Sequence, residues 1–419
     1  MTTVAINDPI SNDVGPPTGA RLTNALVLLI GAAVFLNYVD RGAIGVAAPL
    51  MKADLGLSAT RFGLAVSAFF WIYAPIQIVI GWLCDRVSVY RLFTFGLVLW
   101  SIATVLTGFV GGLTGLIALR VMLGLGESIA FPGGSKLIAR HVAPEKRGFA
   151  NAVMSSGLAF GPAAGTLIGG TILSHYGWRP IFVVFGVATL AWLLPWEITL
   201  RGLTTGGATA REAPFPIRRL LALKPLWLST FGHFTANWGL YFTLTWLPLF
   251  LVTQRHFSLP QMTLLAGLTY CAQGVTALLV GRWSDRMVAG GRREGAVRRG
   301  FCVASHLGVA AGIMGIAFAG GVPALAFWLL LTGAALGLCF PNLYGIAQIF
   351  AGARASGMWI GVQNAFGNIS GIAGPFITGM LIDATGHFTA AFVLSAGVAL
   401  LGALWWGLVL PEIKPAVVD

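Results

Sequence analysis

The sequence has few charged residues. Asp, Glu, Lys and Arg make up 10% of its 419 residues, while hydrophobic residues make up 57%. A soluble domain is about 25% charged and about 45–50% apolar. The composition therefore fits a soluble enzyme, a disordered chain and a nucleic-acid-binding protein badly.

Cysteine is also scarce. The four cysteines lie in or beside apolar segments, without CxxC or metal-ligand spacing. This pattern predicts neither a disulfide framework nor a metal site, and we expect no cofactor. HExxH and GxSxG motifs are missing as well, so we expect no catalytic residues and no membrane-embedded enzyme.

Long apolar segments are what the chain has in abundance. A helix of about 20 apolar residues crosses the ~30 Å hydrocarbon core of a membrane, and backbone polar groups must pair internally there. The sequence predicts an all-α membrane protein whose twelve transmembrane helices lie near 24–50, 62–84, 92–113, 115–138, 149–173, 180–199, 226–252, 262–284, 299–319, 323–346, 357–382 and 388–410.

The basic residues predict the orientation of these helices. With both termini in the cytoplasm, 19 of the 26 Lys and Arg residues fall on the cytoplasmic side and three fall inside spans. Only Lys52, Arg61, Arg179 and Arg255 fall outside. Positive charge collects in cytoplasmic loops of membrane proteins. We therefore expect a multi-pass protein of the inner (plasma) membrane, and we assign the net charge of +12 to topology, not to nucleic acid.

The spans divide into two halves. We predict a cytoplasmic tail over 1–21, a six-helix bundle over 22–200, a cytoplasmic linker over 201–225, a second bundle over 226–411 and a tail over 412–419. The halves share landmarks: a Gly-x-x-x-Asp-Arg segment follows spans 2 and 8, and Phe-Pro and Gly-Pro pairs recur in spans 4/10 and 5/11. Internal repeats around a central site are typical of secondary transporters.

Glycines at 157, 161, 165 and 169 share one face of span 5. This spacing lets two helices approach closely, either as static packing or as an interface that moves.

Four charged residues lie inside the predicted membrane. Asp40 and Arg41 are in span 1, and Arg120 and Glu127 are in span 4. Each charge at the bilayer centre costs about 2.5–3.5 kcal/mol on insertion scales, so such residues pair or face a cavity. Arg120 and Glu127 share a helix face roughly 10 Å apart. We predict two contacts that each join a span-1 charge to a span-4 charge.

These charges have two interpretations. One is a structural ion-pair network. The other is a site at which Arg41 alternates between Glu127 and an anionic substrate, while Glu127 alternates between its ionised and protonated forms. Tyr38 lies one turn from Arg41, and Tyr73 lies in the middle of span 2, so both are candidates to line a cavity.

These residues resemble a known family. The segment from Gly81 to Arg86, with Arg91 after it, resembles the loop signature of the major facilitator superfamily. Asn37-Tyr38-x-Asp40-Arg41, Arg120-x6-Glu127 with Phe131-Pro132-Gly133, and Trp246-Leu-Pro248 resemble its anion:cation symporters. That group includes sialin, vesicular glutamate transporters and bacterial importers of sugar acids and organic acids.

The resemblance implies two six-helix bundles that rock around a central site and take up a small organic anion together with a proton. We expect a monomer. Arg41 resembles the ligand of the substrate carboxylate, and Asp40, Glu127 and Arg120 resemble the proton-coupling group, with Arg120 as the partner of Asp40. Further candidate substrate-binding residues are assigned by similarity to the family or by their position in span 7. They are Tyr38, Tyr73, His233, Asn237, Tyr241, Asn364 and Asn368. Gly81, Asp85, Arg86, Arg91, Asp285 and Arg286 resemble cytoplasmic gate residues.

Two positions depart from the sugar-acid importers. These carry a glutamine in helix 5, where this chain reads Ser155-Ser156-Gly157, and another in helix 7, where this chain has His233. Because these two amides would bind sugar hydroxyls, their loss makes an aromatic or less hydroxylated carboxylate as good a candidate substrate as a sugar acid. We also expect Gly157 to enlarge the pocket. A proton-antiport exporter of a drug or metabolite remains the alternative, although Arg41 would repel cationic cargo. A transporter-like sensor that binds a ligand and signals is a further alternative. It would normally need an added soluble domain, and the loop between spans 8 and 9 and the two predicted tails are too short for one.

Overall fold

The computed structural model describes residues 20–142, 144–202 and 216–416. Within those ranges the regular structure is helical. Residues 1–19 of the predicted N-terminal tail and most of the predicted linker lie outside the described residues, as do the last three residues of the predicted C-terminal tail. Residues 20 and 21 already belong to the first helix.

The first half of the chain forms six spans from eight helices. Two spans are each built from a broken pair of helices, α4 with α5 and α7 with α8. The helices are α1 (Ala20–Asp54), α2 (Ala59–Arg86), α3 (Val89–Thr107), α4 (Leu113–Glu127), α5 (Ala130–His141), α6 (Pro144–Tyr176), α7 (Arg179–Ala191) and α8 (Leu193–Gly202).

The second half repeats this plan after a short helix in the connecting segment. Its helices are α9 (Ile217–Leu221), α10 (Lys224–Thr253), α11 (Leu259–Ala289), α12 (Glu294–Phe318), α13 (Val322–Gly367), α14 (Ile369–Thr385) and α15 (Thr389–Leu404), followed by the π-helix η1 (Trp405–Val409). α13 covers all of span 10 and the start of span 11. It is interrupted between the two spans at Gly352, whose positive φ of 62° is not helical.

Proline explains two of the breaks. Pro132 has no N–H to donate to the carbonyl of Ser128, and α4 ends just before that residue, at Glu127. Pro195 likewise leaves the carbonyl of Ala191 without its helical partner, and α7 ends at Ala191. The break in span 4 places Glu127 at a helix terminus near the middle of the bundle.

The twelve predicted spans are confirmed. Eleven helical stretches of the described chain are long and apolar enough to cross a membrane. The twelfth, α10, has 30 residues and is buried along most of its length. It carries several buried polar residues, among them threonines, His233 and Asn237.

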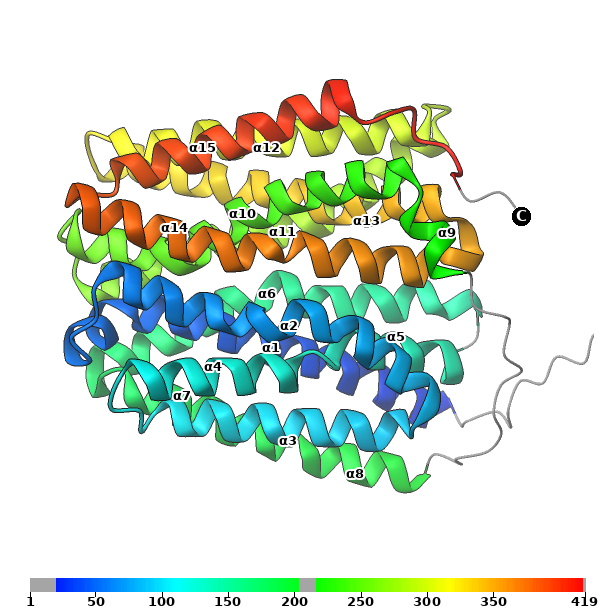
Figure 1. The fold of residues 1–419 in the computed structure, drawn as a ribbon, viewed down its shortest axis with the longest axis horizontal. Coiled ribbons are helices and arrows are strands. Elements are labelled where there is room, and N and C mark those ends of the chain that lie inside the picture. Colours follow the sequence, from blue (N-terminus) through cyan, green and yellow to red (C-terminus); the bar gives the residue numbers. More distant parts are fainter. Residues whose placement is uncertain (1–19, 143, 203–215, 417–419) are drawn as a thin grey trace, which may run out of the picture.

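The helices run side by side in two groups (Figure 1). α1 to α8 form one half of the molecule, and α10 to α15 form the other. The start of α1 and the end of the described C-terminal segment lie at the same end of the bundle, which we call the terminal end. The opposite end carries the connections 55–58, 254–258 and 386–388, and we call it the distal end.

The glycine face of α6 packs within the first half. A Cβ on Gly161 would lie 2.4 Å from the Cβ of Tyr38, and one on Gly165 would lie 2.3 Å from the carbonyl oxygen of Val39. Real Cβ atoms essentially never come this close to another atom. The stripe therefore holds α6 against α1 inside one bundle, and it fixes the backbone that carries Tyr38.

The two halves pack tightly toward the distal end. A Cβ on Gly45 of α1 would lie 2.0 Å from the carbonyl oxygen of Leu244 in α10. One on Gly63 of α2 would lie 2.3 Å from the carbonyl oxygen of Pro375 in α14. Such small residues let helix backbones touch, so the distal side of the bundle is closed.

Asp383 adds a polar contact between the halves at this end. Its carboxylate, from α14, accepts hydrogen bonds from the backbone N–H groups of Ala59 (2.9 Å) and Thr60 (2.7 Å). These are the first two residues of α2, whose N–H groups have no partner inside their own helix. A carboxylate at a helix N-terminus is also favoured by the helix dipole. One half therefore caps a helix of the other.

We expect Asp383→Ala to weaken distal closure. An N-cap carboxylate contributes about 0.5–2 kcal/mol, which corresponds to a shift of roughly 2- to 30-fold toward distal opening. The measurement is the alkylation rate of a cysteine placed at the buried Thr263 of α11, which packs on Gly170 of the other half. The four native cysteines are first replaced.

Asp54→Ala is the matched control for this experiment. Asp54 also lies at the distal end, but its carboxylate accepts hydrogen bonds from Trp178 and Arg179 of its own half. Equal alkylation rates in the two variants would show that Asp383 does not hold the halves together.

Candidate functional site

A buried ion pair joins α1 to α4 at the centre of the first half. The Nε and Nη2 atoms of Arg41 each lie 3.1 Å from Oε2 of Glu127. Only 6% of the Arg41 side chain and none of the Glu127 side chain is exposed. One of the two predicted contacts between span 1 and span 4 is therefore confirmed.

Aromatic rings surround the guanidinium of Arg41. Its Cζ lies 4.7 Å from the ring centre of Tyr38, 4.8 Å from that of Phe69 and 4.6 Å from that of Tyr73. Ring faces attract a cation, most strongly where water is excluded. The rings and one carboxylate thus stabilise a charge that lies far from bulk water.

Asp40 is held by α3, contrary to the prediction. Its Oδ2 accepts hydrogen bonds from the indole N–H of Trp100 and the hydroxyl of Thr104 (3.1 Å). These donors lie one turn apart on α3 and reach the same oxygen. Among the described residues no ion pair joins Asp40 to Arg120, so the second predicted contact is wrong.

Arg120 instead lies over the edge of the aromatic cluster. Its Cζ is 5.7 Å from the ring centre of Phe69, the ring that also faces Arg41. The side chain is buried, and its Nε donates to no described residue. Arg120 therefore contributes positive charge to the buried group without a direct partner for that nitrogen.

Each buried carboxylate keeps one oxygen without a donor. Within the described part of the chain, Oδ1 of Asp40 and Oε1 of Glu127 accept no hydrogen bond and are shielded from solvent. The formal charges of these two acids and of the two arginines cancel. Adding an anion would leave one uncompensated negative charge, which is costly in a buried site.

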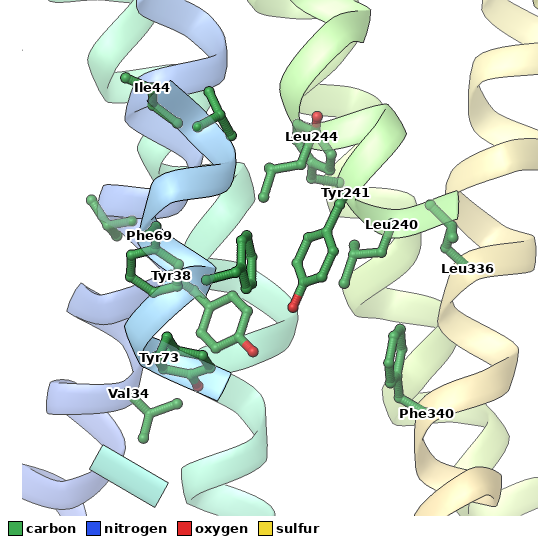
Figure 2. Close-up of a cluster of buried hydrophobic side chains, with 14 of the residues drawn as sticks. Val34, Tyr38, Ile44, Phe69, Tyr73, Leu240, Tyr241, Leu244, Leu336 and Phe340 are labelled. Carbon is green, nitrogen blue, oxygen red and sulfur yellow. The ribbon is translucent and has the colours of Figure 1, made fainter. Parts of the chain in front are cut away.

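The second half faces this group with polar side chains. The hydroxyl of Tyr241 in α10 points toward Tyr38 and Tyr73 (Figure 2), and it donates to Oδ1 of Asn368 at 2.5 Å. Nδ2 of Asn368 donates to Oδ1 of Asn364 at 3.1 Å. The structure therefore brings six predicted pocket residues together: Arg41, Tyr38, Tyr73, Tyr241, Asn364 and Asn368.

His233 and Asn237 lie apart from these hydrogen bonds. The ring of His233 packs against Gly367 and against the rings of Phe340 and Tyr344, with centroid distances of 6.2 and 5.8 Å. Asn237 is 3% exposed, and its side chain bonds to none of the described residues. Sequence alone gave no sign that these two would separate from Tyr241 on the same helix.

Gly157 does not enlarge the pocket as predicted. A Cβ there would lie 2.6 Å from the backbone nitrogen of Phe35. The missing side chain is replaced by the backbone of α1, so this position packs two helices and leaves no added space at the centre.

The predicted gate residues lie toward the terminal end of the bundle. Arg86 stacks over Trp82 at 4.1 Å, and Asp285 pairs with Arg298 at 3.7 Å inside its own half. Gly81 has open space around it, and Arg91 and Arg286 are exposed. The side chain of Asp85 lies outside the described residues. These contacts do not join the two halves, and the gating role stays a prediction.

Sequence reasoning missed several neighbours of the site. Trp100 and Thr104 bind Asp40, Phe69 contacts both arginines, and Oε1 of Gln77 accepts a hydrogen bond from Asn364 at 2.6 Å. Gln77 had a usable signal, because it is a polar residue in an apolar span one turn after Tyr73. Trp100 gave no such signal, because a tryptophan in a membrane span is usually interpreted as a packing residue.

The family assignment rests on most of the chain. The model of the Major Facilitator Superfamily matches residues 30–305 and 256–418. The chain belongs to the Major Facilitator Superfamily. The fold and family predicted from its motifs are confirmed, and members of this superfamily are transporters, not enzymes.

Curated relatives within the Major Facilitator Superfamily cover nearly the whole chain. A probable sulfoacetate transporter of Cupriavidus necator is 32% identical over 391 residues, which is 88% of this chain and 90% of that protein. A hexuronate transporter of Bacillus subtilis is 28% identical, covering 90% of this chain and 92% of its own length.

Solved structures of the superfamily share the fold. A bacterial homologue of the human lysosomal transporter Spinster, in an inward-facing and unoccupied conformation, superposes with a TM-score of 0.77 at 18% identity, covering 94% of this chain and 98% of that one. This likeness supports the arrangement of the twelve spans.

We expect Trp100→Phe to destabilise the transporter. The variant keeps an aromatic ring but removes a hydrogen bond to the buried Asp40. Removal of a donor to a charged group lowers the free energy of unfolding by about 1–3 kcal/mol. The measurement is the midpoint of thermal unfolding in detergent.

Ser101→Ala is the matched control on α3. Ser101 is equally buried, but its hydroxyl donates only to the carbonyl of Leu97 in its own helix. If the two variants unfold at the same temperature, Trp100 does not stabilise Asp40.

Proposed function

We propose that this protein imports a small organic carboxylate together with protons by alternating access. The observation that carries the proposal is the buried pair of Arg41 and Glu127 among aromatic rings that face the second half. The names of two relatives, a probable sulfoacetate transporter and a hexuronate transporter, support an organic anion as the cargo.

Charge balance supplies the coupling. The substrate carboxylate binds Arg41 and displaces Glu127 from it. Oε1 of Glu127, which accepts no hydrogen bond from the described residues, then takes a proton, and the buried group returns to neutrality. Oδ1 of Asp40 offers a second position for a proton. A neutral site can be closed off from water on both sides of the membrane without the cost of burying an uncompensated charge, so the transporter can then open to the other side.

The orientation belongs to the same proposal. With both termini in the cytoplasm of a plasma membrane, the distal end faces outward. The close approaches between the halves and the cap by Asp383 then support an outward-closed state, from which the substrate is released to the inside.

A ligand screen gives the first test. Sugar acids, aromatic acids and dicarboxylates are added to the purified protein, and the unfolding midpoint is recorded. A ligand present at 100 times its Kd stabilises the folded state by about 2.7 kcal/mol. We expect at least one carboxylate to stabilise the wild type, and Arg41→Ala to abolish the effect. Stabilisation that persists in Arg41→Ala would place the carboxylate elsewhere.

A transport assay tests the coupling. In proteoliposomes we expect Glu127→Gln to lose accumulation of the best carboxylate of the screen under a pH gradient, yet to keep counterflow exchange. Glutamine keeps the size of the side chain but cannot release a proton. Glu197→Gln is the control, because Glu197 lies on the exposed side of α8. Normal pH-driven accumulation in Glu127→Gln would contradict the coupling role.

A further inference from the structure

Gln77 links the two halves beside the arginine site. It lies on α2, one turn after Tyr73, so both side chains project from the same helix face. The side chain is 6% exposed, and its Oε1 accepts the 2.6 Å hydrogen bond from Asn364 of α13. Nε2 of Gln77 has no partner among the described residues and is shielded from solvent.

The hydrogen bonds fix which way this amide points. Nδ2 of Asn368 donates to the backbone carbonyl of Asn364 at 2.8 Å, and because a carbonyl can only accept, this atom is the nitrogen of the amide. The same nitrogen donates to Oδ1 of Asn364 at 3.1 Å. The nitrogen of Asn364 must therefore face Gln77, and the oxygen of Gln77 must receive it. The series ends in a donor, the Nε2 group of Gln77, and only an acceptor can satisfy it.

The unused donor belongs to the helix face that also contacts Arg41, the cation that holds the carboxylate in the proposed function. Tyr73 contacts the guanidinium of Arg41 at 4.6 Å, and Gln77 is the next residue on that face of α2. An unsatisfied buried donor costs about 1–3 kcal/mol, which an oxygen of the ligand would recover. Pockets reach high selectivity by this means, because a ligand without the matching atom leaves the donor unpaired.

We propose that Gln77 is a specificity-determining residue whose Nε2 donates to a second oxygen group of the substrate, while Arg41 binds the carboxylate. The substrate class is then a carboxylate that carries another acceptor oxygen, from a hydroxyl, carbonyl or sulfonate group. This proposal rests on the proposed function.

The test measures selectivity with two matched ligand pairs. D-glucuronate is compared with cyclohexanecarboxylate, and sulfoacetate with propionate, by isothermal titration of the purified protein. We expect the wild type to prefer the oxygen-rich member of at least one pair. Gln77→Leu should weaken that ligand about tenfold and change its apolar counterpart less than twofold, so the ratio of the two Kd values falls about tenfold.

Gln363→Leu is the matched control. Gln363 is also a buried amide whose Nε2 has no described partner, but its Oε1 accepts from Ser229 and Trp359 of its own half. This variant should leave the ratio of the two Kd values unchanged. A changed ratio in Gln363→Leu would show that the readout reports loss of any buried amide, and it would overturn the assignment.

The remaining outcomes separate the two proposals. If Gln77→Leu weakens both ligands of a pair equally, or weakens neither, Gln77 only joins the halves and its specificity role is overturned. A wild type that shows no preference within either pair has the same meaning. If no ligand binds the wild type, or if Arg41→Ala binds as the wild type does, the proposed function itself fails.

Discussion

The pairing of Arg41 with Glu127 in a water-poor site constrains the rest of the structure. Neither charge is stable there alone, because an unpaired buried ion costs far more than a surface ion. The pair therefore needs α1 and α4 in fixed register, and the glycine contacts between α6 and α1 hold α1 at the required depth. The aromatic rings around Arg41 allow it to remain charged when its carboxylate partner changes.

The second half meets this charged group with neutral hydrogen-bonding groups. Tyr241, Asn368 and Asn364 donate in one direction toward Gln77, so the hydrogen bond that joins Asn364 to Gln77 across the halves depends on amide orientation and not on charge. The asymmetry has a physical consequence. The buried charges Asp40, Arg41, Arg120 and Glu127 all belong to one bundle, so a movement of the other bundle would not separate these opposite charges.

The sequence predicted much of the fold because length, hydropathy and basic residues act locally. It also predicted the contact between Arg41 and Glu127, since few partners exist for a charge in a membrane. It failed for Asp40, because Trp100 and Thr104 are unremarkable residues of an apolar helix whose nearness depends on packing between α1 and α3. Gly157 failed for the same reason, because a small residue can leave space or admit a backbone.

Asp40 and Glu127 have different hydrogen-bond partners, and this difference indicates different roles for the two acids. Oδ2 of Asp40 accepts from two neutral donors, Trp100 and Thr104, and an arriving anion does not compete for either of them in the proposed function. Oε2 of Glu127 is held by Arg41, the guanidinium that binds the substrate in the proposed function. Arrival of an anion therefore changes the surroundings of Glu127 directly and those of Asp40 only through the field of the shared buried group. In the proposed mechanism, Glu127 is therefore the acid that responds to substrate binding, while Asp40 keeps the partners that the fold gives it.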